Sequence, residues 1–166
     1  MRSLNVYLLT LVLIILLGGG INPASAQNYG TAIGLRMGYS VGLTVKGHLD
    51  AEKAIEGLLY FRSRGLGLTI LYEKHADAFG SSDLQWFYGV GGHFGYWNKD
   101  RNLNAPVFTE ETDVIGGVDG ILGIEYTIRE IPFCISLDYK PLLNLFGTGE
   151  VPRFGHGGAL SIRYLL

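Results

Sequence analysis

Apolar and polar residues alternate with a period of two along most of the chain after residue 30. In the segment 86–97, Trp86, Tyr88, Phe94 and other large residues take one parity, whereas glycines and His93 take the other. Side chains two apart in a β-strand share a face. The segment therefore predicts a strand with an apolar face that has aromatic residues at both ends, opposite a face of small and polar residues.

The same alternation predicts further strands on both sides of this segment. Eight strands in sequence, an even number, allow an up-and-down sheet to close on itself and leave no free edge. We therefore expect an all-β fold, an eight-stranded antiparallel up-and-down β-barrel. The predicted strands lie at about 33–39, 43–49, 54–61, 66–73, 86–97, 118–128, 133–140 and 160–166.

Charged residues within these strands all lie on the face opposite the large apolar side chains. Bases and acids nearly balance on that face, so a structural network of salt bridges is favoured over a catalytic pair of carboxylates. The predicted network consists of Arg36, Lys46, Glu56, Glu73, Asp119, Glu125, Asp138, Lys140 and Arg163.

A membrane barrel and a soluble barrel differ in which face of the strands, apolar or charged, lines the interior. The ten steps from Trp86 to Tyr96 span about 33 Å, and a tilted strand of that length fits the ~25 Å apolar band of an outer-membrane barrel. An outer surface this apolar would aggregate in water. We expect a transmembrane barrel whose narrow lumen is plugged by charges, with inward glycines leaving room for them. A soluble, lipocalin-like barrel that binds an apolar ligand is the alternative, because parity does not say which face is inside.

The connections between the predicted strands are unequal in length. On one side they fall at 40–41, 62–65, 98–112 and 141–157, and on the other at 50–53, 74–83 and 129–131. The two longest loops lie on the same side, as in outer-membrane barrels, where long loops face outward. Loops 98–112 and 141–157 are therefore the predicted contact regions for an extracellular partner.

The N-terminus has the features of a secretory signal peptide. Arg2 precedes an apolar run of 12 residues, and Ala24-Ser25-Ala26 forms a small-residue cleavage site before Gln27. The run is too short to cross a bilayer as a helix. We expect residues 1–26 to be removed and residues 27–166 to form one barrel domain.

Composition narrows the possible functions little further. Without residues 1–26 the chain has 12 basic and 15 acidic residues, a net charge of −3, which gives no support for nucleic-acid binding. Cys134 is the only cysteine, so no disulfide can form within the chain.

Several segments resemble small outer-membrane β-barrel proteins of Gram-negative bacteria, and in particular a group of mostly uncharacterised barrels from Bacteroidetes. The resemblance rests on segments 31–36, 42–46, 136–141 and the C-terminal strand 161–166, which ends in Leu166 where that class often ends in an aromatic residue. It implies a monomer in the cell outer membrane, surrounded by lipid and inserted by the barrel-assembly machinery, with a structural or surface-interaction role.

Candidate chemistry is sparse. The chain has no HxH, CxxC or HExxH motif, and His48 and His93 lie on the predicted charged face, so we expect no metal, cofactor or catalytic site. Because some small outer-membrane barrels modify lipids, such an enzyme remains an alternative. It would need a serine and a histidine on one face, whereas Ser161 and His156 are five residues apart and lie on opposite faces.

Overall fold

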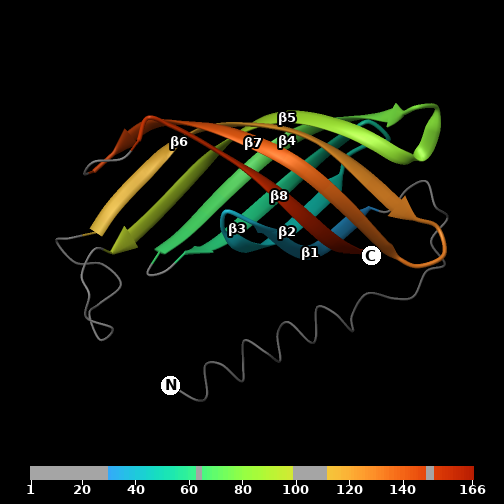
Figure 1. The fold of residues 1–166 in the computed structure, drawn as a ribbon, viewed down its shortest axis with the longest axis horizontal. Coiled ribbons are helices and arrows are strands. Elements are labelled where there is room, and N and C mark those ends of the chain that lie inside the picture. Colours follow the sequence, from blue (N-terminus) through green and yellow to red (C-terminus); the bar gives the residue numbers. More distant parts are fainter. Residues whose placement is uncertain (1–29, 63–64, 99–111, 149–151) are drawn as a thin grey trace, which may run out of the picture.

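The computed structural model describes residues 30–62, 65–98, 112–148 and 152–166, and they form a closed barrel of eight antiparallel strands (Figure 1). Each strand pairs with its neighbours along the chain, and β1 pairs with β8 to close the sheet. The predicted fold class is thus confirmed as an all-β, eight-stranded barrel. The strands are β1 (Thr31–Gly38), β2 (Val41–His48), β3 (Lys53–Arg62), β4 (Gly65–Ala78), β5 (Ser81–Asn98), β6 (Thr112–Ile128), β7 (Phe133–Gly147) and β8 (Phe154–Leu165).

The two ends of the barrel differ. We call the end that carries the connections at 49–52, 79–80 and 129–132 the turn end, and the opposite end the loop end. The predicted loop 98–112 lies mostly outside the described residues. The predicted signal peptide and its cleavage site lie outside them as well.

The segment 74–83 is not the loop that its small and acidic residues predict. Residues up to Ala78 continue β4, Ser81 begins β5, and only Phe79 and Gly80 form the turn. Their φ angles are 54° and 74°. Two residues with positive φ make a tight hairpin turn whose twist matches that of the strands. Lys74, His75 and Ala76 continue the alternation between outside and lumen, and the register shifts between Asp77 and Ala78, just before the turn.

The second long loop is also shorter than predicted. β7 continues to Gly147 and β8 begins at Phe154, so most of the predicted loop 141–157 is strand. The sequence 142–146, with its leucines and Phe146, is more apolar than an exposed loop requires, and its position in a strand explains this. β6 likewise begins at Thr112, before the predicted position.

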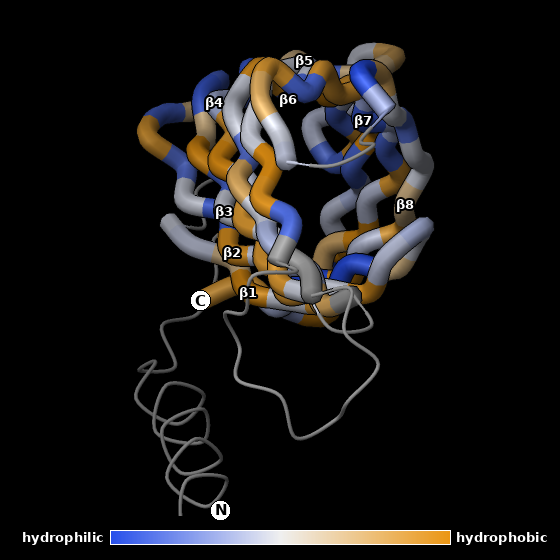
Figure 2. Tube along the Cα trace, turned by 90° about the vertical axis from the view of Figure 1, so that its left-hand side faces the viewer, coloured by the Kyte–Doolittle hydropathy of each residue, from blue (hydrophilic) through white to orange (hydrophobic). Residues whose placement is uncertain are grey.

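The face assignment by parity agrees with the burial of the side chains. Along β5, Trp86, Tyr88 and Val90 are exposed on the outer surface, whereas Phe87 is completely buried inside. Figure 2 shows hydrophobic and hydrophilic residues alternating along the strands. The apolar face therefore points outward, which is the reverse of a barrel that encloses an apolar ligand.

Inward glycines have a second role besides the one predicted. At Gly34, Gly42, Gly89 and Gly91, the first atom that an added Cβ would meet is a carbonyl oxygen of the adjacent strand. These glycines therefore permit the close approach of adjacent strands, and at Gly89 and Gly123 an added Cβ would also meet the side chains of Glu73 and Asp138.

Substitution of Gly91 tests this role. Gly91→Ala is expected to lower the free energy of unfolding by about 1–3 kcal/mol, because the methyl group would overlap the carbonyl of Ile70. Gly57→Ala is the matched control: Gly57 is on the outer parity, its added Cβ would lie 3.9 Å from the nearest atom, and a change below about 1 kcal/mol is expected. Equal unfolding midpoints in denaturant for the two variants would contradict the assignment.

Candidate functional site

The structure places all nine charged residues of the predicted network inside the barrel. Their exposed fractions range from 0% to 8%, and they come from every strand except β5. Because alternate positions of each strand point into the lumen, side chains far apart in the sequence meet there. They divide into one cluster nearer the turn end and two pairs nearer the loop end.

Five of these residues form what we call the central ion cluster: Lys46, Glu56, Glu73, Glu125 and Arg163. The Arg163 guanidinium donates hydrogen bonds to Glu56 and, over 3.0 Å, to Glu125. Lys46 Nζ lies 2.9 Å from Glu73 Oε2 and 3.1 Å from Glu125 Oε2. Each base thus bridges at least two acids, and together the five residues tie β2, β3, β4, β6 and β8 to one another.

Neutral side chains complete the hydrogen bonding of this cluster. Arg163 Nε donates to Thr44 Oγ1 over 3.0 Å, and Arg163 Nη1 donates to Ser136 Oγ over 2.7 Å. Lys46 Nζ lies 4.3 Å from the centre of the Phe87 ring, within cation–π distance. Thr44 and Phe87 were not among the predicted site residues, although both have the inward parity that would have identified them.

The remaining four predicted residues form two pairs nearer the loop end. Arg36 and Asp138 form a bidentate ion pair, in which Arg36 Nη2 donates to Asp138 Oδ1 over 2.6 Å. Lys140 Nζ lies 2.7 Å from Asp119 Oδ1, and the other oxygen of Asp119 lies 3.0 Å from His93 Nδ1. His93 is held on its other side by Asn144, with 2.8 Å between Nε2 and Oδ1. His93 is therefore part of the hydrogen-bonded network.

Apolar side chains also fill part of the lumen. Leu58, Leu71, Phe87 and Ile121 are at most 4% exposed and pack together. A cavity of about 190 Å³ is lined by Arg36, Tyr60, His93, Lys140 and by residues at the loop end such as Tyr39. The described part of the lumen is thus plugged by both ion pairs and apolar packing, with hollow space toward the loop end.

Two further ion pairs lie at the turn end of the barrel, and each joins a turn residue to a residue in the first part of a strand. Lys53 Nζ donates to Asp50 over 2.9 Å, and this hydrogen bond holds the pKa of the Asp50 carboxyl below its usual value. Arg129 Nε donates to Asp83 over 2.6 Å, and this carboxylate raises the pKa of Arg129. Both pairs are open to water, so they are worth little to stability.

The serine and histidine of the alternative enzymatic site are not brought together. Ser161 is completely buried inside the barrel, as is Ser136, whereas His156 is exposed and lies beside Tyr139, with ring centres 5.8 Å apart. A nucleophilic serine needs a base within hydrogen-bonding distance. Ser161 and His156 thus lie on opposite faces of β8, as their spacing predicts, and they do not form such a pair.

Comparisons with known proteins do not identify the chain. No protein-family model matches it, and a search of curated proteins gives no significant match. Among the described residues, no helix is long and apolar enough to cross a membrane.

Proposed function

We propose that this protein is a monomeric outer-membrane β-barrel with a structural or surface-interaction role. The observation that carries the proposal is the inverted distribution of side chains. Ionic residues occupy the lumen, and large apolar residues cover the outside. A water-soluble barrel has no reason to expose such a surface, whereas lipid hydrocarbon favours it.

The outer surface supports the proposal strand by strand. Exposed positions on β2, β4 and β5 carry Val45, Ile70 and Val90, which are 45%, 56% and 68% exposed. An isolated apolar residue on a surface has no special meaning, but a continuous apolar belt marks a contact with lipid or protein. Closure of the sheet leaves backbone groups of all eight strands paired, as a hydrocarbon environment requires.

Aromatic residues gather toward both ends of the strands. Trp86 lies toward the turn end of β5, and Phe94 lies nearer its loop end. Across the sheet, the exposed residues Tyr126 and Tyr164 lie near the turn end, and Phe61 and Phe154 near the loop end. Two aromatic belts on an apolar band are typical of barrels that cross a membrane.

The plugged lumen and the connections at the loop end define the proposed role. Ion pairs and apolar packing leave the described lumen poorly suited to diffusion of solutes, which disfavours a porin. Residues 1–26 would direct export, the barrel-assembly machinery would insert the barrel, and the β5–β6 and β7–β8 connections at the loop end would face the outside. A surface partner would then contact side chains at the loop end, and the proposal includes no catalytic step.

Membrane fractionation tests the proposal. The protein is expected in the outer-membrane fraction and, after refolding, to migrate faster on a gel without heating than after boiling, because the closed barrel resists detergent. Its N-terminus should be Gln27. A protein that stays in solution without detergent would contradict the membrane assignment even if the barrel were correctly folded.

A further inference from the structure

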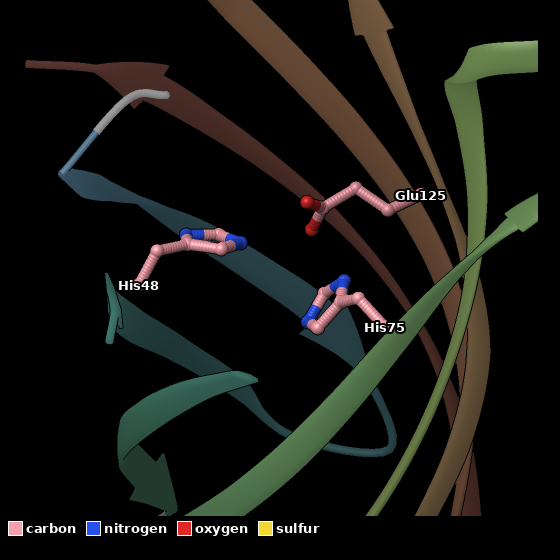
Figure 3. A group of neighbouring side chains, drawn as sticks. All are labelled: His48, His75 and Glu125. Carbon is pink, nitrogen blue, oxygen red and sulfur yellow. The ribbon is translucent and has the colours of Figure 1, made fainter. Parts of the chain in front are cut away.

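Two imidazole rings and one carboxylate meet in the lumen beside the central ion cluster. His48 is the last residue of β2, His75 lies on β4 and Glu125 on β6. Figure 3 shows these three side chains extending toward a common space. One potential ligand atom from each residue lies within 4.8 Å of the other two.

The environment of His75 is that of a metal-binding histidine. Its side chain is completely buried, Nε2 lies 3.2 Å from Glu73 Oε2, and Nδ1 has no hydrogen-bond partner. The ring is held by stacking on Phe87, with ring centres 5.3 Å apart. Histidines that bind a metal through one nitrogen usually donate the other N–H to a carboxylate, which fixes the ring. Glu73 is placed to accept that hydrogen bond and leaves Nδ1 for a metal.

The charges nearby favour an additional cation. The central ion cluster contains three carboxylates but only two bases, Lys46 and Arg163, so one negative charge is in excess. An uncompensated charge inside a protein is costly. A dication bound by two neutral imidazoles and Glu125 would change this formal charge from −1 to +1, and loss of one proton from the metal-bound water would bring it to zero.

We propose that His48, His75 and Glu125 bind one transition-metal dication, for which Zn²⁺ is the best candidate. Two imidazole nitrogens and one carboxylate oxygen form a known ligand set for Zn²⁺, and water takes the fourth position. Imidazole ligands disfavour Ca²⁺ and Mg²⁺, which prefer oxygen.

The required movement is small. Ligands of a tetrahedral Zn²⁺ lie roughly 3.4 Å apart, so atoms now within 4.8 Å must close by up to roughly 1.4 Å. His48 is only half-buried and ends its strand, so it can adjust and gives the metal access from the turn end. The inference concerns the lumen alone and does not depend on the membrane assignment.

Zinc titration of the refolded, untagged protein tests the proposal. After removal of metal with a chelator, one Zn²⁺ per chain is expected by calorimetry and by elemental analysis after desalting, and Co²⁺ should give the visible absorption of a four-coordinate site. Glu73→Gln should weaken binding by about 10–100-fold, because Glu73 orients His75. His48→Gln and His75→Gln should weaken it further.

Two other histidines provide matched controls. His93→Gln removes a lumen histidine held by Asp119 and Asn144, and His156→Gln removes an exposed one. Both variants should bind Zn²⁺ like the parent. If His75→Gln does not fold, the test uses His48→Gln, because His48 is half-buried and ends its strand. Binding of less than one Zn²⁺ by the parent, equal affinity in His48→Gln, or loss of binding in either control would overturn the proposal.

Discussion

Replacement of Arg163 by methionine is expected to lower the free energy of unfolding by about 3–5 kcal/mol, the largest effect that we anticipate for a single residue. Arg163 is completely buried and hydrogen bonds to Glu56, Glu125, Thr44 and Ser136. Methionine fills similar space but donates nothing, so two carboxylates lose a partner without regaining water. Denaturant unfolding of the refolded barrel, followed by tryptophan fluorescence, measures the loss.

Arg129→Met is the matched control for this substitution. Arg129 also pairs with an acid, Asp83, but its side chain is 61% exposed in a turn. Water replaces that interaction, so little or no change in stability is expected. Glu56→Gln removes the acid of the Glu56–Arg163 pair and should also destabilise the barrel. Asp50→Asn, in a turn, should leave its stability unchanged. Lumen variants that unfold together with the parent would show that the central ion cluster does not stabilise the barrel.

The second large effect concerns the outer surface. Val90 is 68% exposed in the middle of β5. Val90→Arg is expected to lower the free energy of unfolding, measured in lipid vesicles, by about 2–4 kcal/mol. The cost arises because the arginine would lie at the bilayer midplane. On a water-exposed surface the same change would have almost no effect, so the experiment separates a membrane barrel from a soluble one.

Val41→Arg controls for the residue change itself. Val41 is 58% exposed but begins β2 at the loop end, close to the expected membrane surface. A loss of about 0–1 kcal/mol is expected there. Similar losses for both variants, or none at Val90, would contradict the membrane assignment while leaving the barrel fold intact.

Parity along the strands was the most informative sequence signal. It separated inward from outward residues correctly along β5, and it selected nine charged residues that the structure places in the lumen. This works because a strand has only two faces, so one inward residue fixes the direction of the others up to the next register shift, such as those after Asp77 and Gly116.

Strand ends were predicted less well, for reasons of local composition. Residues 74–83 contain small and acidic residues typical of loops, yet the positive φ angles of Phe79 and Gly80 allow a two-residue hairpin. Pro141 suggested the start of a loop, yet it lies within β7, opposite His156. Both segments have a composition typical of loops, so the alternation of apolar and polar residues did not identify them as strand.

The sequence alone did not predict which side chains pair with each other across the lumen. Which acid meets Arg163 depends on the register of all eight strands, and one sequence does not specify register. The group formed by His48, His75 and Glu125 was missed for the same reason, since it joins three strands without a short motif. Because the segment 74–83 was predicted to be a loop, His75 was not assigned to the inward face of a strand.

Closure of the sheet links the ion cluster to the folding process. Seven of the eight strand pairings join neighbours along the chain, and only the seam of seven residue pairs between β1 and β8 joins its two ends. Arg163 lies in that seam, opposite Gly34, yet its guanidinium reaches Glu56 on β3 and Glu125 on β6. While the seam is open, water solvates these ions and their mutual attraction is weak. Partly closed barrels should therefore be poorly populated, and tryptophan fluorescence and gel migration should report one concerted unfolding transition.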